Sequence, residues 1–331
     1  MAEQWDDPVS TKVLTFGEPL MAFVPGEQER LNRAHSFRPH VAGAELNTAI
    51  GLARLAVPVS FACAAGMDPF GSRLIRAARA EGIHTEFMEA KAEGSTGIFF
   101  KEQDGLTGDT KVFYYRSTTP MALGLWHSTL LRKQVRSGAW GWVHTTGITW
   151  MLGTQTARHS LDLLTDARRG GATVSFDVNV RLKLAPVNRW VSMVQDVISH
   201  ADWLFMGNEE ARLLFGREQA TDVEQLARET GFSGVGVIVK RGEHGASASV
   251  LGKVTETPAW LVDHVVDSVG AGDGFNAGWI AAMVRGWPLP DALRLGALIG
   301  ASAVVSTGDS DGYLTWDEAS GMLSGQREAL R

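Results

Sequence analysis

The sequence has 331 residues, of which 44% are apolar and 21% are charged. This composition is ordinary for globular proteins and excludes disordered and collagen-like chains, and the length allows one large domain with an appendage or two domains. The 31 basic and 37 acidic residues give a net charge of −6, without the basic cluster that a nucleic-acid surface needs. No apolar run approaches the roughly 18 residues of a membrane-spanning helix, and residues 1–10 do not resemble a secretory signal.

The first third of the chain predicts alternating strands and helices. Residues 13–16 are an apolar run ended by Gly17, which predicts a first strand, whereas the segment 21–40 is polar and irregular. Apolar residues at helical spacing predict a helix over 44–55. Next we expect a strand over 57–64, a helix over 70–81, and a hairpin that pairs 97–100 with 111–115.

The rest of the chain alternates steadily between the two kinds of element. The expected strands are 142–146, 173–178, 203–206 and 235–240, and the expected helices are 156–169, 187–199, 209–215, 222–230, 272–285, 290–306 and 316–323. Strands separated by such helices indicate an α/β protein with a mostly parallel sheet covered on both faces. The early hairpin breaks the alternation, so we expect a small separate β layer.

Two buried polar or reactive side chains are expected to be structural. Cys63 is the single cysteine and lies in the apolar run 61–65, so we expect a small interior side chain in a protein of the reducing cytoplasm. His144 lies within an expected strand and is interpreted as an interior histidine. No cluster of histidines and cysteines has the spacing of zinc ligands.

The stretch 267–278 carries the clearest chemical signal in the sequence. It reads Asp-Ser-Val-Gly-Ala-Gly-Asp-Gly-Phe-Asn-Ala-Gly and leads into an expected helix. Gly270, Ala271 and Gly272 lack bulk, so the amides at this helix N-terminus are predicted to form an anion hole for phosphate oxygens. Asp273 at the same place is predicted to be the general base for a hydroxyl that attacks a phosphoryl group. The spacing also allows Asp273 simply to cap the helix.

Two other nucleotide-binding patterns are less well supported. Gly272, Gly274 and Ala277 fit the dinucleotide pattern G-x-G-x-x-[GA], but helices follow where a βαβ unit is needed. The phosphate-binding loop G-x-x-x-x-G-K-[ST] is absent, because Val254 follows Gly252 and Lys253. A dehydrogenase is therefore a weaker alternative than a kinase.

Residues 267–273 resemble the signature D-T-x-G-A-G-D of the ribokinase-like (PfkB) sugar kinases, with Ser268 in place of threonine. The segment 42–49 is similar to the family element Gly-Gly-x-x-x-Asn-x-Ala, with Ala42 in place of the first glycine. The resemblance runs from about residue 13 to 323. It implies a ribokinase-like three-layer α/β/α sandwich over residues 11–323, with tails 1–10 and 324–331. The small β layer expected from the order of the elements, made from about 17–40 and 96–116, would be the lid of this sandwich. The resemblance also implies ATP and Mg²⁺.

Within that family, several segments look like 2-keto-3-deoxygluconate kinases, and they are 17–19, 43–47, 112–116, 177–181 and 308–309. This resemblance implies that the sugar-acid pocket is lined by Gly43, Asn47, Phe99, Tyr114, Arg116, Arg181 and Asp309. Arginine suits this role because its guanidinium pairs bidentately with a carboxylate. From the residues alone, both arginines can also be surface charges, Tyr114 can pack within the lid, and Asp309 can be a turn former.

The nucleotide side of the site is also implied by the resemblance. Residues 240–246 match the family's nucleotide loop, and the implied nucleotide-binding residues are Asn179, Lys240, Arg241, Gly242, Gly245 and Gly272. Glu210 matches the glutamate of the metal element N-x-x-E, which would act on Mg²⁺ through water, although Gly207 stands in the asparagine position.

The sequence therefore predicts a cytoplasmic kinase that phosphorylates the terminal hydroxyl of 2-keto-3-deoxygluconate with ATP. Its expected partners are small molecules, not nucleic acid or membrane. Members of the family commonly dimerise through their lids, and the resemblance therefore implies a homodimer or higher homo-oligomer. The alternatives are a family kinase for fructose, ribose, another hexose or a nucleoside, and a non-catalytic sugar-binding regulator.

Overall fold

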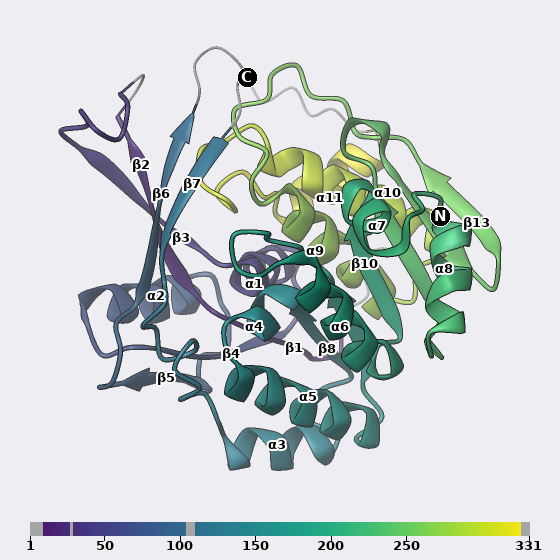
Figure 1. The fold of residues 1–331 in the computed structure, drawn as a ribbon. Coiled ribbons are helices and arrows are strands. Elements are labelled where there is room, and N and C mark those ends of the chain that lie inside the picture. Colours follow the sequence, from purple (N-terminus) through teal and green to yellow (C-terminus); the bar gives the residue numbers. More distant parts are fainter. Residues whose placement is uncertain (1–8, 27–28, 104–109, 326–331) are drawn as a thin grey trace.

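The computed structural model describes residues 9–26, 29–103 and 110–325. Its main feature is a large sheet with the strand order β13-β12-β11-β10-β9-β8-β1-β4-β5 (Figure 1). Seven neighbouring strands of this sheet, β11 to β5 in that order, are parallel. The strands are β1 (Val13–Phe16), β4 (Val59–Gly66), β5 (Met88–Lys91), β8 (Trp142–Thr146), β9 (Thr173–Asp177), β10 (Trp203–Gly207), β11 (Gly236–Lys240), β12 (Ala246–Val250) and β13 (Lys253–Thr257).

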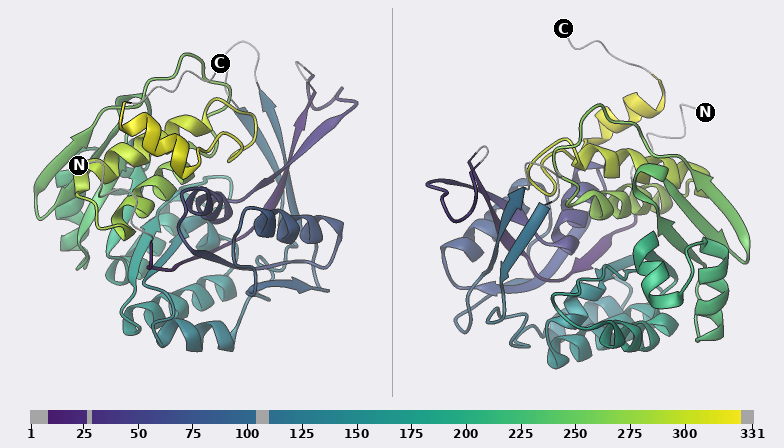
Figure 2. Two further views of the ribbon diagram at one scale, coloured as in Figure 1. Left: turned by 180° about the vertical axis from the view of Figure 1, so that it is seen from behind. Right: turned by 45° about the horizontal axis from the view of Figure 1, so that its top comes forward.

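Helices cover both faces of the large sheet and so make three layers, as the sequence predicted (Figure 2). One face packs against α1 (Ala44–Arg54), α2 (Pro69–Ala80), α9 (Ala271–Val284), α10 (Leu289–Ala303) and α11 (Trp316–Leu323). The other face packs against α3 (Thr129–Arg136), α4 (Gly147–Met151), α5 (Thr154–Arg169), α6 (Val187–Val197), α7 (Asn208–Phe215) and α8 (Ala220–Glu229). Within the described residues no helix combines the length and the apolar character needed to cross a membrane.

Trp279 anchors α9 on the sheet. The centre of its fully buried ring lies 4.7 Å from the ring centre of Trp203, 5.1 Å from that of Phe205 and 5.8 Å from that of Trp142. Aromatic rings at such distances stabilise one another beyond the area they bury. The packing fixes α9 over the strands, and with it the glycine-rich turn from which α9 begins.

A second sheet, which we call the small sheet, stands at one edge of this body (Figures 1 and 2). Its strand order is β3-β2-β6-β7, from β2 (Leu20–Pro25), β3 (Phe37–Ala42), β6 (Gly97–Gln103) and β7 (Thr110–Tyr115). The pairings are antiparallel except that of β2 with β6. The expected hairpin is therefore present as β6 and β7; its connecting residues 104–109 lie outside the described residues.

The segment 21–40 was wrongly predicted to be irregular, since β2 and most of β3 fall within it. Both faces of β2 are apolar, so the alternation of polar and apolar residues that signals a strand is missing. Pro39 also argued against a strand, but β3 is an edge strand, where a proline does not break a ladder. The expected interior positions of Cys63 and His144 are confirmed, because both side chains are fully buried.

Candidate active site

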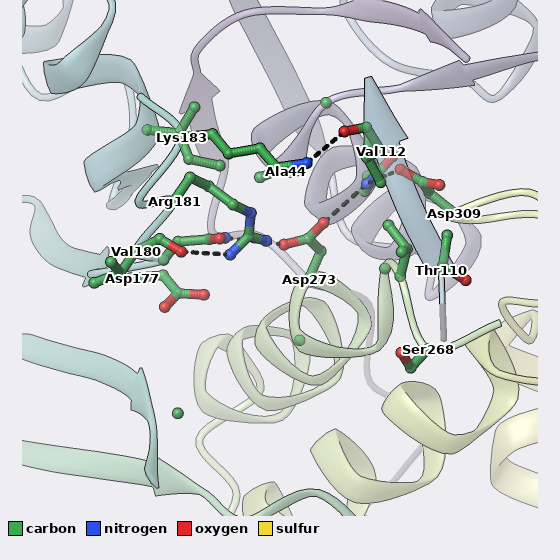
Figure 3. Close-up of a pocket in the computed structure, with 18 of the residues that line it drawn as sticks. Ala44, Thr110, Val112, Asp177, Val180, Arg181, Lys183, Ser268, Asp273 and Asp309 are labelled. Carbon is green, nitrogen blue, oxygen red and sulfur yellow. Dashed lines mark hydrogen bonds between the residues drawn. The ribbon is translucent and has the colours of Figure 1, made fainter. Parts of the chain in front are cut away.

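A cavity of about 820 Å³ lies between the small sheet, the carboxyl ends of β9 and β10, and the start of α9 (Figure 3). Ligands bind at the carboxyl ends of strands in open α/β sheets. Fourteen of the predicted site residues line this cavity: Gly43, Asn47, Phe99, Tyr114, Arg116, Asn179, Arg181, Glu210, Lys240, Gly242, Gly270, Gly272, Asp273 and Asp309. Ala271, Arg241 and Gly245 do not line it.

The turn into α9 is shaped by Gly270. Its φ of 93° lies in the left-handed region, and a Cβ there would overlap the carbonyl oxygen of Asp309. The first hydrogen bond of the helix runs from the Gly274 amide to the Gly270 carbonyl at 2.9 Å. The amides of Gly272 and Asp273 therefore have no acceptor within the helix and are available to an anion.

The Ala271 amide is the exception within the predicted anion hole. It donates to the Ser268 carbonyl at 3.3 Å, and the residue does not line the cavity. The candidate anion site thus consists of the Gly272 and Asp273 amides, with Gly270 forming the turn that exposes them.

Asp273 presents its carboxylate to the cavity and not to its own helix. Oδ2 accepts a hydrogen bond from Asn47 Nδ2 at 2.8 Å, and Oδ1 lies 3.4 Å from Asn179 Nδ2. Asn179, expected on the nucleotide side, therefore also contacts this carboxylate. No side-chain cap bond holds the start of α9, so the geometry does not favour the capping alternative.

The surroundings of Asp273 raise the pKa of its carboxyl group towards neutral pH. Burial raises its pKa to about 7, while the Asn47 hydrogen bond acts in the opposite direction. Asp177 adds to the increase, and the cations Lys240 and Arg181 reduce it. A carboxylate with a pKa near 7 can accept a proton at physiological pH and still release it afterwards.

Lys240 lies beside the anion turn, held by residues that the sequence analysis did not assign. Its Nζ is 2.7 Å from Asp177 Oδ2 and 3.3 Å from Asn276 Oδ1, and Asn276 Nδ2 donates to the same Asp177 oxygen at 2.7 Å. A Cβ on Gly272 would lie 3.3 Å from the ammonium. Asp177 could have been noticed from its place at the end of an expected strand.

The carboxylates of Asp177 and Glu210 suit a hydrated divalent cation. Asp177 Oδ1 is buried without a hydrogen-bond partner in the described part of the chain. The carboxylate of Glu210 accepts hydrogen bonds from the Val180 amide at 2.6 Å and from the Gly207 amide at 2.7 Å. Burial and the nearby charge of Asp177 raise the pKa of Glu210. Since the described residues contain no group of three or more metal-binding side chains, Mg²⁺ would need water and phosphate for its remaining ligands.

The two arginines of the cavity have different surroundings. Arg116 is buried and forms an ion pair with Glu18, and its guanidinium lies 5.4 Å from the centre of the Tyr114 ring. Arg181 is exposed, donates to the Val180 carbonyl at 2.9 Å, and forms no ion pair with any described residue (Figure 3). The sequence analysis missed Glu18, although the residue stands within the quoted segment 17–19.

Glu45 and Lys101 are further buried charges that the sequence analysis did not select. Glu45 Oε1 accepts hydrogen bonds from the hydroxyls of Thr146 and Thr149, both at 2.7 Å, and burial raises its pKa. These bonds fix the start of α1 against the end of β8. Lys101 forms a 2.5 Å ion pair with Asp309, which is therefore more than a turn former.

Comparison with known proteins places this site in context. Residues 10–316 match the model of the pfkB family carbohydrate kinases. The chain is 33% identical over 319 residues to a 2-dehydro-3-deoxygluconokinase of Bacillus subtilis, covering 95% of this chain and 96% of that protein. It is 28% identical to a 2-dehydro-3-deoxygalactonokinase of Haloferax volcanii, covering 96% and 98%.

A solved structure is similar throughout. The chain superposes with a TM-score of 0.85 on a putative Ribokinase II from E. coli in complex with ATP and Mg²⁺, at 22% identity, covering 95% of this chain and 99% of that one. The ribokinase-like fold expected from the sequence is thereby confirmed.

Proposed function

The chain belongs to the pfkB family of carbohydrate kinases, phosphotransferases that act on a sugar hydroxyl, and we propose that its reaction is the ATP-dependent phosphorylation of the terminal hydroxyl of 2-keto-3-deoxygluconate. One observation carries this proposal. A single cavity contains Asp273 at the start of α9 and Arg181, an exposed arginine that forms no salt bridge with any described residue. The first group serves phosphoryl transfer, and the second suits an acceptor with a carboxylate.

The proposed step is an in-line displacement. The hydroxyl oxygen of the sugar forms a bond to the γ-phosphorus, and its proton passes to the carboxylate of Asp273. The bond between the γ-phosphorus and the β–γ bridging oxygen breaks, and ADP leaves. The amides of Gly272 and Asp273 and the ammonium of Lys240 stabilise the negative charge on the transferring group.

The nucleotide is proposed to bind on the Lys240 side of the cavity, between Gly242 and the start of α9. Arg241 and Gly245 would act there through the backbone of the loop, because the Arg241 amide donates to the Gly245 carbonyl at 2.7 Å and the Arg241 side chain is paired with Glu256. Mg²⁺ would be held near Asp177 and Glu210 and would neutralise phosphate charge.

The sugar acid is proposed to bind between the small sheet and Arg181, with Asn47, Phe99 and Tyr114 around it. Asn47 Oδ1 is buried and has no hydrogen-bond partner among the described residues, which leaves an acceptor for a sugar hydroxyl. Two relatives are named for gluconate-derived and galactonate-derived acids, so both epimers are candidates. A neutral sugar is the alternative substrate.

We propose that the small sheet is the lid of this site and that a second copy of the chain covers its outer face. That face carries Phe100, whose ring lies 5.5 Å from Phe23, 5.3 Å from Phe37 and 5.9 Å from Tyr115. Tyr115 is 64% exposed, which is high for an aromatic side chain. Light scattering should give a dimer for the wild type and a monomer for Tyr115→Asp.

The deciding experiment measures ATP consumption over a panel of sugars and sugar acids, with Asp273→Asn as the background control. The expected result is that 2-keto-3-deoxygluconate or its galactonate-derived epimer gives the highest kcat/KM. A higher value for fructose, ribose or a nucleoside would reject the sugar-acid assignment. Absence of turnover with every compound, together with calorimetric sugar binding, would support the non-catalytic regulator.

A further inference from the structure

Lys101 is a lysine of the small sheet that lies in the protein interior. It is on β6, two residues after Phe99 and on the same face, which points towards the body, and its side chain is 2% exposed. Its ammonium is 2.6 Å from Asp267 Oδ2, 2.5 Å from Asp309 Oδ1 and 3.4 Å from the Thr307 carbonyl oxygen. We call these four residues the Lys101 cage.

The cage holds one positive and two negative charges away from water. Burial acts to lower the pKa of Lys101, but Asp309 and Asp267 raise it above its usual value, so the ammonium remains charged. A buried ion pair is often no more stabilising than apolar side chains of the same size, whereas one partner left alone is strongly unfavourable. The cage therefore specifies a geometry: the sheet is in place only when the ammonium lies between the two carboxylates.

One carboxylate of the cage begins the turn that leads to the anion site. Asp267 Oδ1 accepts hydrogen bonds from the Val269 amide at 3.1 Å and from the Thr110 hydroxyl of β7 at 3.0 Å. Asp267 thus ties two strands of the small sheet to the backbone just before Gly270. A displaced sheet would release this turn from both of its side-chain contacts.

The other carboxylate of the cage connects to Asp273. The Nδ2 of Asn47 lies 2.8 Å from Asp273 Oδ2 and 3.5 Å from Asp309 Oδ2, so the two carboxylates face the same donor. While Lys101 neutralises Asp309, the Asn47 amide stays with Asp273. The backbone of Asp309 also packs against Gly270, which links the cage to the anion turn a second time.

The segment 307–311 meets the small sheet at another point as well. His40 on β3 lies 2.8 Å from Asp311, through Nδ1 and Oδ2. On the opposite side of the cavity, Lys183 of the body donates to the Val112 carbonyl of β7 at 2.8 Å. These contacts lie at the surface, whereas the Lys101 contact is buried and reaches the catalytic turn.

We propose that Lys101 is a positioning residue that couples the placement of the small sheet to assembly of the catalytic turn. When the sheet closes, the ammonium enters between Asp267 and Asp309, fixes the turn 267–270, and leaves the Asn47 amide to Asp273. Sugar bound beneath the sheet thereby completes the site for phosphoryl transfer. The inference rests on the proposed function, with Asp273 as the base.

The kinetic test uses Lys101→Met, which keeps the length of the side chain and removes its charge. We expect kcat/KM for the sugar to fall at least about tenfold, with the KM for ATP within about twofold of the wild type. Arg38→Met, which removes an exposed cation from β3, is the matched control and should behave as the wild type. A rise in the KM for ATP as large as the fall in the sugar kcat/KM, or a fall in the sugar kcat/KM below about twofold, would overturn the proposal.

A rescue experiment separates positioning from general damage. In Lys101→Ala, ethylammonium can occupy the cage, and we expect it to raise the sugar kcat/KM roughly fivefold or more without affecting the wild type or Asp273→Asn. If circular dichroism shows that Lys101→Met does not fold, the double variant Lys101→Met/Asp267→Asn is measured in its place. This double variant restores the net charge of the cage. Wild-type kcat/KM in that double variant would show that charge balance alone matters and would overturn the proposal.

Hydrogen exchange of the ligand-free proteins tests Lys101 without any turnover. Lys101→Met should exchange faster than wild type and Arg38→Met in β6, β7 and residues 267–270, while β8 to β10 remain unchanged. Unchanged exchange in the small sheet would overturn the proposal. This measurement still decides the role of Lys101 if the wild type phosphorylates none of the sugars, an outcome that would count against the proposed function alone.

Discussion

Asn47 and Asp273 are 226 positions apart in the chain, yet Asn47 Nδ2 lies 2.8 Å from Asp273 Oδ2. The contact exists because α1 and α9 pack side by side on one face of the large sheet, with the starts of both helices at the cavity. The hydrogen bond occupies one carboxylate oxygen and orients the other. Asn47 thus prepares the proposed base before any substrate arrives.

Replacing Asp273 with Asn should remove most of the turnover and leave ATP binding intact. The amide cannot accept the hydroxyl proton, and the loss of a general base costs about 10²–10⁴-fold in rate. The measurement is kcat on the best substrate, with the Kd for ATP from calorimetry as the control. Retention of more than about one tenth of the wild-type kcat would mean that Asp273 is not the base.

The kcat/KM for the sugar should rise with pH and level off above about 7. The pKa of Asp273 is raised to about 7 by burial, so the carboxyl is protonated and inactive as a base at lower pH. Because the Asn47 hydrogen bond lowers this pKa, Asn47→Ala should move the midpoint to higher pH. A pH profile that is flat between 5 and 8, or a midpoint shared by both proteins, would contradict this assignment.

The same carboxylate should reduce the stability of the fold at alkaline pH. A carboxyl whose pKa is higher in the folded than in the unfolded state favours folding at low pH, and that contribution is lost as the pH rises through about 7. Asp273→Asn carries no charge to bury, so it should have a higher Tm than the wild type at pH 8. The difference should shrink at pH 5, and calorimetric scans at both values provide the measurement.

Much of the body could be predicted from the sequence, because its elements show a single clear periodicity. The bounds predicted for the helix 44–55 and the strand 142–146 agree almost to the residue with those of α1 and β8 in the structure. The hairpin of β12 and β13 was missed because its strands carry serines and threonines and few large apolar residues. Its turn, Leu251 and Gly252, has positive φ at both positions, as a two-residue hairpin turn requires, and only the glycine signals this.

The candidate site residues were predicted from their likeness to a family pattern, whereas their ionic partners were not predicted. Lys101 stands in a strand, where a lysine is ordinarily assigned to the solvent face, and its two carboxylate partners come from distant loops. The pairing of Arg116 with Glu18 likewise depends on how β2, β6 and β7 are arranged. Such pairings arise from tertiary packing, and no local pattern of the sequence encodes them.

Sugar binding to the wild-type protein should slow hydrogen exchange in the small sheet. If this sheet is a lid, substrate beneath it adds contacts to the strands β6 and β7 and excludes water from the cavity. The comparison is exchange with and without the sugar acid, with ATP alone as the control. Slowing confined to residues 235–246 would show that the sheet is not a lid.

Arg181→Met should lower kcat/KM for the sugar acid by about 10–100-fold, because a charge-assisted hydrogen bond contributes roughly 1.5–3 kcal/mol and about 1.4 kcal/mol corresponds to tenfold. Arg181 is the arginine expected to meet the carboxylate, since the charge of Arg116 is already paired with Glu18. ATP binding should change little. Arg158→Met, which removes an exposed cation from α5 outside the cavity, is the control.

The two arginines can be distinguished by combining stability with specificity. Arg116→Met leaves the buried carboxylate of Glu18 without its counter-ion, so that variant should have a lower Tm and a lower activity than the wild type. Arg181→Met should keep the Tm of the wild type. Arg181→Met should also narrow the preference for the sugar acid over fructose, since the unpaired cation that disfavours a neutral sugar is gone. If Arg181→Met instead slows both substrates equally, Arg181 acts on the phosphoryl group, and recognition of the sugar carboxylate must come from elsewhere in the cavity.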